Sequence, residues 1–86
     1  MGFDTRTTEL IAIGASVAAN CQACLQYHVD KARENEVAPE EIAEAIEVGR
    51  AVGRGAASGM KRFASTLTAA SSSAADPIPQ GCGCPP

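Results

Sequence analysis

The sequence predicts an all-α fold: a helical hairpin packed on one long helix in an oligomeric helical bundle, followed by an extended C-terminal tail. Apolar residues recur three and four positions apart along most of the first 70 residues, as in amphipathic helices. Residues 71–86, "SSSAADPIPQGCGCPP", are rich in Ser, Pro and Gly, which favours an extended chain without a packed core. We therefore expect a helical domain over residues 1–70 and a tail over residues 71–86.

Size and charge narrow the classes of function. A chain of 86 residues forms one small core, which usually needs support from an oligomer, a metal or disulfides. A net charge of −3 argues against nucleic acid or an acidic membrane surface as the partner. The sequence shows no signal peptide and no apolar run long enough to cross a bilayer, so the expected location is the cytoplasm. Thiols stay reduced there, and the four cysteines therefore point to catalysis or metal binding.

The first two predicted helices cover residues 7–19 and about 21–34. Asn20 is the expected N-cap of the second helix, because its side chain can accept from exposed amides of the first turn. Asn35 suits the left-handed end of that helix. The first helix is indicated by apolar side chains at helical spacing: Leu10, Ile13 and Val17.

The third predicted helix begins at Pro39, which fits the first helical position, with two acids beside the positive helix end. Its apolar and small residues are spaced alternately four and three positions apart, which is a heptad pattern. The centre of this pattern is rich in glycine, which lets another backbone come close. A break into two helices near Gly53–Gly55 is the alternative. The residues of this pattern are Ile42, Ile46, Gly49, Gly53, Ala56, Met60, Phe63 and Leu67.

The length of this helix predicts an oligomer. About 30 helical residues span about 45 Å, whereas each 14-residue helix of the hairpin spans about 21 Å. The hairpin cannot cover the whole apolar face, and the part around Met60, Phe63 and Leu67 is left without a partner in the same chain. We therefore expect this face to be covered by a second subunit of an obligate homo-oligomer.

The segment "NCQACLQYHV", residues 20–29, carries the most informative pattern. Cys21, Cys24 and His28 share one helical face because they lie three and four residues apart. Exposed amides and the positive dipole end at a helix start favour a thiolate, and C-x-x-C at a helix start is the geometry of dithiol redox catalysts. A metal site is one alternative, and two small buried hydrophobic side chains are another.

An imidazole that exchanges a proton with a thiol needs an orienting partner, usually a carboxylate. If the chain folds back at Asn20, the residues opposite His28 fall near positions 9–12, and Glu9 is the only acid there. Glu9 is therefore predicted to orient His28. An ordinary acid that faces water is the other interpretation of this residue.

The spacing Glu9, eleven residues, Cys21, two residues, Cys24, three residues, His28 resembles the alkylhydroperoxidase D branch of the carboxymuconolactone decarboxylase superfamily. The resemblance extends less sharply to Ser65. It implies an all-helical trimer or hexamer that needs no cofactor. It also implies that Cys24 is the peroxidatic thiol, that Cys21 resolves it, and that Glu9 and His28 form a proton relay.

Two features depart from this branch. Ala23 stands where the characterised peroxidases often carry a further histidine, and the chain holds one copy of the helical unit where those proteins often hold two. The decarboxylase branch lacks the C-x-x-C pair, so lactone decarboxylation is not expected.

The resulting functional prediction is a dithiol oxidoreductase, either a thiol-dependent peroxidase or a disulfide reductase. Its expected partners are a small peroxide or disulfide substrate, a dithiol reductant protein and further copies of the chain. The alternative is a soft-metal or metalloid binding protein that uses the C-x-x-C pair, His28 and the tail. A third hypothesis is an assembly module whose thiols are vestigial.

The tail cysteines Cys82 and Cys84 form a C-x-C pair, which binds soft metals and also forms oxidising disulfides. They are predicted as an auxiliary redox or metal pair. An extended tail with two incidental thiols is the alternative.

Overall fold

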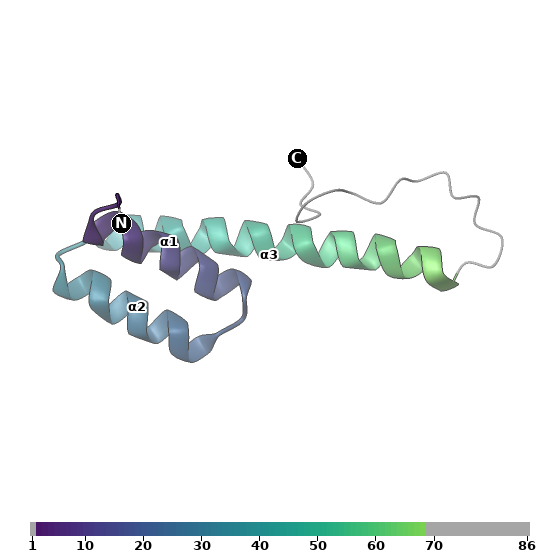
Figure 1. Ribbon diagram of the computed structural model, residues 1–86, viewed down its shortest axis with the longest axis horizontal. Coiled ribbons are helices and arrows are strands. Elements are labelled where there is room, and N and C mark those ends of the chain that lie inside the picture. Colours follow the sequence, from purple (N-terminus) through teal and green to yellow (C-terminus); the bar gives the residue numbers. More distant parts are fainter. Residues whose placement is uncertain (1, 69–86) are drawn as a thin grey trace. The chain divides into compact units, whose positions relative to one another are not determined.

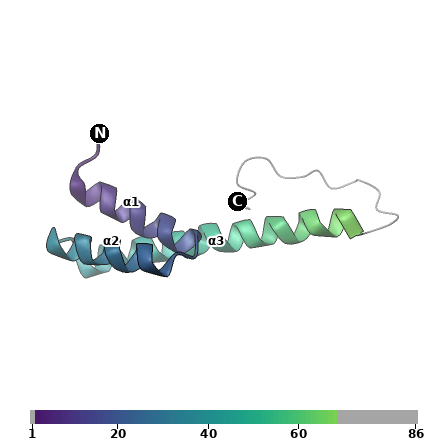
Figure 2. The same ribbon diagram turned by 60° about the horizontal axis from the view of Figure 1, so that its bottom comes forward.

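The computed structural model describes residues 2–68, and within that range it holds three α-helices and no strand (Figures 1 and 2). These are α1 (Thr5–Ala18), α2 (Gln22–Glu34) and α3 (Pro39–Thr68). The predicted all-α class is therefore confirmed. The chain divides into two compact units, Met1–Gly53 and Arg54–Pro86. The predicted tail and its boundary lie outside the described residues.

α1 begins two residues earlier than predicted because Asp4 caps it. The Asp4 carboxylate accepts a hydrogen bond from the Thr7 amide at 2.7 Å. This hydrogen bond holds the pKa of the Asp4 carboxyl below its ordinary value. α1 then packs along α2 as the predicted hairpin (Figure 1).

The turn between α1 and α2 corrects the predicted N-cap. Asn20 does not cap α2; it adopts a left-handed conformation with φ of 57°, which Asn tolerates better than most residues. Cys21 is the N-cap instead, and its Sγ accepts the Cys24 amide at 3.2 Å. The Cys21 amide donates to the Ser16 carbonyl at 3.0 Å, which closes the turn.

The end of α2 corrects a second prediction. Asn35 has φ of −97°, and the left-handed residue is its neighbour Glu36, with φ of 59°. The Glu36 amide donates to the Arg33 carbonyl and the Val37 amide donates to the Ala32 carbonyl, each at 3.0 Å. This is the Schellman arrangement, and the two apolar residues that it brings together, Ala32 and Val37, are both buried.

The core of the first unit lies between the three helices. Ile13 of α1 is fully buried, and partly buried side chains such as Leu10 and Ile46 pack around the core. Arg6 of α1 forms an ion pair with Glu41 at the start of α3. The remaining core residues come from α2, the following turn and α3: Val29, Ala32, Val37 and Ile42.

α1 and α3 approach each other closely at two glycines, as the glycine-rich centre of the heptad pattern predicted. A Cβ atom added to Gly49 would lie 2.8 Å from the Val17 Cβ and would also collide with the Gly14 carbonyl oxygen. A Cβ added to Gly14 would lie 3.3 Å from the Ala45 carbonyl oxygen. By contrast, a Cβ on Gly53 would meet only the Ala18 Cα, at 4.0 Å.

α3 begins at Pro39 as predicted and is one continuous helix of 30 residues, so the alternative break near Gly53–Gly55 does not occur. The prediction that its C-terminal apolar residues are uncovered within the chain is confirmed, because Met60, Phe63 and Leu67 are 66%, 38% and 71% exposed. Along residues 2–68, none of the helices combines the length and the apolar character that a membrane crossing requires.

Gly49→Ala is expected to lower the free energy of unfolding by about 1–3 kcal/mol, because its methyl group collides with backbone and with Val17. Gly53→Ala is the matched control and should be neutral or stabilising by up to about 1 kcal/mol, because Ala is the better helix former and the site has room. Urea unfolding followed by circular dichroism measures both. A Gly49→Ala variant as stable as wild type would contradict the described α1–α3 contact.

Candidate functional site

The two central cysteines lie at the start of α2 and are joined by a disulfide, with 5.2 Å between their Cα atoms. Cys24 is exposed, whereas Cys21 is half-buried. The Cys24 amide points at the Cys21 sulfur because Cys21 caps the helix. The same amide would stabilise a thiolate on Cys21 once the disulfide is reduced.

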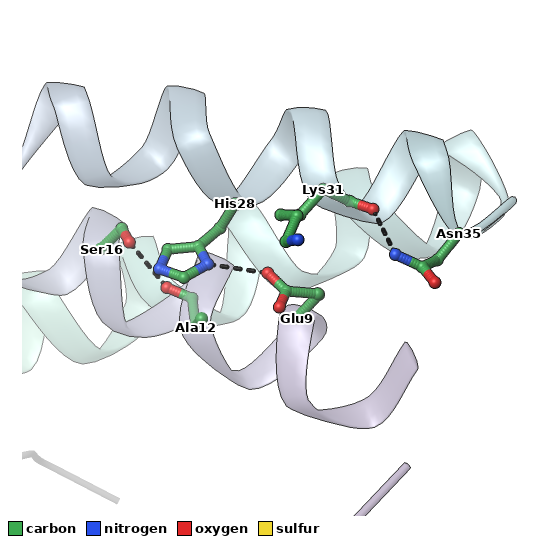
Figure 3. A network of polar contacts seen from close by, with 6 residues as sticks. All are labelled: Glu9, Ala12, Ser16, His28, Lys31 and Asn35. Atoms are coloured by element: carbon green, nitrogen blue, oxygen red, sulfur yellow. Dashed lines mark hydrogen bonds and ion pairs between the residues drawn. The ribbon is translucent and has the colours of Figure 1, made fainter. Parts of the chain in front are cut away.

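Glu9 of α1 meets His28 of α2 across the hairpin. The Glu9 Oε1 lies 2.7 Å from the His28 Nδ1, and Figure 3 shows the imidazole directed at the carboxylate. Glu9 is only 7% exposed, so it is not the solvent-facing acid of the alternative interpretation. A buried carboxylate needs such a partner, because burying an unpaired charge is costly. The hairpin prediction that Glu9 lies beside His28 is confirmed.

This hydrogen bond leaves the second ring nitrogen of His28 for proton exchange. When Glu9 is ionised and His28 is neutral, Nδ1 carries the proton and donates it, so Nε2 is the acceptor. Cys24 precedes His28 by four residues in α2, which is one helical turn on the same face. The Tyr27 side chain is 57% exposed in the chain, and its ring contacts the His28 ring edge-on at 5.0 Å between centroids.

A hollow of about 250 Å³ opens beside Cys21, between the end of α1, the start of α2 and the middle of α3. Sequence reasoning did not find it, because it depends on how closely α3 approaches α1. Ile46 and Arg50, which line the hollow, lie on either side of Gly49 in α3. The presence of Gly49 in the heptad pattern was therefore the one sequence feature that indicated a close helix approach at this place. The residues that line the hollow are Ser16, Val17, Asn20, Cys21, Gln22, Leu25, Ile46 and Arg50.

The alternative prediction of a metal site finds no preformed cluster in the part of the chain that the structure describes. Among residues 2–68, no three His, Cys, Asp or Glu side chains are arranged to hold a metal ion. Cys82 and Cys84, predicted as an auxiliary redox or metal pair, lie outside the described residues.

Fold and site together define a small all-helical protein with a cysteine pair at the start of a helix and a carboxylate-bonded imidazole on the same helix. The model of the carboxymuconolactone decarboxylase family matches residues 2–71, and the chain belongs to this family. The superfamily part of the predicted resemblance is thereby confirmed. No curated protein and no solved structure gives a significant match to the chain.

In the reduced protein at neutral pH, His28 is expected to hold its proton on Nδ1 because the Glu9 carboxylate accepts it. Nitrogen-15 NMR measures the tautomer directly, and His28 gives an unambiguous signal because it is the only histidine of the chain. Glu9→Gln should shift the population toward the Nε2-protonated form, whereas the exposed-acid control Glu44→Gln should not. Identical tautomer populations in all three proteins would contradict the Glu9–His28 pairing.

Proposed function

We propose that the protein is a dithiol oxidoreductase of the alkylhydroperoxidase D type, acting as a thiol-dependent peroxidase or a disulfide reductase. One observation carries the proposal: the Cys21–Cys24 disulfide lies at the start of α2, and the Glu9-bonded imidazole of His28 follows Cys24 by one turn. The family match supports it, because enzymes with this thiol chemistry belong to the same superfamily.

In the peroxidase cycle, His28 accepts the Cys24 proton at Nε2, and the Cys24 thiolate attacks the outer peroxide oxygen. The O–O bond breaks, Cys24 becomes a sulfenic acid, and the alkoxide leaves as an alcohol with the proton from His28. Cys21 then attacks the sulfenic sulfur, which releases water and closes the disulfide. The 5.2 Å between the two Cα atoms lets this bond form without separating the helix start.

The two cysteines suit different steps. Cys24 is exposed and shares a helical face with His28, so it is the thiol that meets the oxidised substrate. With a disulfide substrate, Cys24 would form a mixed disulfide and Cys21 would release it by the same ring closure. A dithiol reductant then returns the pair to thiols, and no bound cofactor takes part. The cytoplasm, which maintains such reductants, is the proposed location.

Peroxidase activity is tested in a background in which Cys82 and Cys84 are both serine, so that only the central pair reacts. With dithiothreitol as reductant, Cys24→Ser should reduce organic hydroperoxide consumption to the uncatalysed rate. In a single oxidation by hydroperoxide after the reductant has been removed, Cys21→Ser should accumulate a sulfenic acid on Cys24, detected by dimedone adduct formation, because the resolving thiol is missing. His28→Asn should lower the rate by about 100-fold or more, because it removes the proton acceptor.

Equal and slow consumption of peroxide and of disulfides by all these variants and their parent would overturn the proposed function. Circular dichroism spectra that match the parent protein serve as the control for folding.

We also propose that the chain forms a trimer or hexamer through the exposed apolar residues Met60, Phe63 and Leu67. Sedimentation should give three or six times the 8.8 kDa chain mass. Phe63→Glu should shift the distribution toward the monomer, because it places a charge in the apolar interface. Ser58→Glu adds the same charge to the opposite side of α3 and should leave the assembly intact. A monomeric wild-type protein would contradict this assignment.

A further inference from the structure

The hollow beside the disulfide gives the two sulfurs different surroundings. Cys21 lines it and Cys24 does not. Its apolar wall comes from Val17, Leu25 and Ile46, one from each helix. Arg50 of α3 is its cationic member. At Cys21 the oxidised pair therefore borders an open hollow that apolar residues and Arg50 also line.

We propose that the hollow binds the thiol that reopens the disulfide, that this thiol bonds to Cys21, and that Arg50 favours small thiols carrying a carboxylate. This inference rests on the proposed redox function and adds to it the chemical class of an electron donor and the position of its attack.

The direction of attack follows from what lines the hollow. A thiolate that occupies it meets the Cys21 sulfur, forms a bond to it and breaks the Cys21–Cys24 bond, so Cys24 is the leaving thiolate. The incoming thiol releases a proton when it ionises, and the Cys24 thiolate takes up a proton in turn; His28, one turn along α2 from Cys24, can carry it between them at Nε2. A second thiol then attacks the mixed disulfide and releases Cys21. Two thiols are oxidised to one disulfide, and the protein gains two electrons and two protons.

Arg50 supplies the selectivity for charge. Its Nε lies 3.4 Å from the Glu47 Oε2, but both side chains are more than half exposed, at 61% and 65%. An exposed pair of this kind is weak, so an incoming carboxylate can replace Glu47. A guanidinium group can bind a carboxylate through two parallel hydrogen bonds, which an ammonium group cannot reproduce. Arg50 thus favours an anionic thiol although the whole chain carries a charge of −3.

The size of the hollow suits a small donor. Its volume of about 250 Å³ has room for a short carbon chain with a thiol at one end and a carboxylate at the other. The probes are therefore 3-mercaptopropionate and its uncharged, nearly isosteric amide, 3-mercaptopropionamide.

The position of attack is tested on the oxidised wild-type chain. The protein is mixed briefly with 3-mercaptopropionate, quenched with acid, alkylated with a maleimide and digested with trypsin. The peptide of residues 7–31 contains both cysteines, and tandem mass spectrometry locates the two labels. We expect the mercaptopropionate on Cys21 and the maleimide on Cys24. The opposite distribution, or an even one, would overturn the proposal.

The charge preference is tested by the rate of disulfide opening in the same peptide, corrected for the thiolate fraction of each probe. The carboxylate should react about fivefold faster than the amide, the size of effect expected for one partly exposed ion pair. Arg50→Gln should abolish the preference, whereas Arg54→Gln, which removes a charge outside the hollow, should retain it. In wild type, 1 M salt should also reduce the preference, because it screens the pair.

These outcomes separate the two proposals. If the protein does not consume hydroperoxide with dithiothreitol as the reductant, the proposed function is refuted. If the wild-type protein turns over with dithiothreitol but shows no preference for the carboxylate probe, only the inference about the hollow is refuted.

Discussion

The backbone contact between Gly14 of α1 and Gly49 of α3 is the constraint on which the first unit depends. It sets the distance between the two helices, because neither position has room for a side chain of ordinary size. Ile46 and Arg50 lie on either side of Gly49 and reach the end of α1 for that reason. The hollow beside Cys21 therefore depends on this helix packing as well as on the turn residues Asn20 and Cys21 that line it.

The pairing of α1 with α2 brings Glu9 and His28 together. α1 brings a buried carboxylate and α2 brings the imidazole, so neither helix holds the proposed relay alone. The cost of burying Glu9 is offset by its hydrogen bond to His28, and the hydrogen bond in turn fixes the orientation of the ring. The packing of the hairpin and the proposed proton transfer thus involve the same pair of side chains.

Much of this arrangement could be predicted from the sequence, because it depends on local periodicity. Apolar spacing identified α1 and α3, two asparagines marked the limits of α2, and counting outward from the turn placed Glu9 opposite His28. The errors fell at helix ends. Asn20 and Asn35 are residues that favour caps and left-handed turns alike, so their presence located each boundary but did not say which neighbour took which role.

The hollow and the place of Arg50 in its lining could not be predicted in this way, because they depend on packing between helices distant in the chain. A glycine at the centre of a heptad pattern indicates that something approaches closely but does not identify the neighbour. The sequence gives no measure of whether an exposed arginine lies beside a sulfur or points into water. Only the relative placement of α1, α2 and α3 decides this.

The position of Cys21 as the cap of α2 has a consequence for how this helix responds to oxidation. The Cys21 sulfur accepts the Cys24 amide in the first turn of α2, and it is also one of the two sulfurs of the proposed redox cycle. A change of its redox state would therefore change the hydrogen-bond acceptor at the start of this helix. As a thiolate it is a charged and stronger acceptor than as half of a disulfide. A reduced and ionised Cys21 would therefore accept the Cys24 amide more strongly than the disulfide sulfur does. Replacement of Cys21 by serine would separate the two roles, because a serine hydroxyl can still cap the helix but cannot form a disulfide.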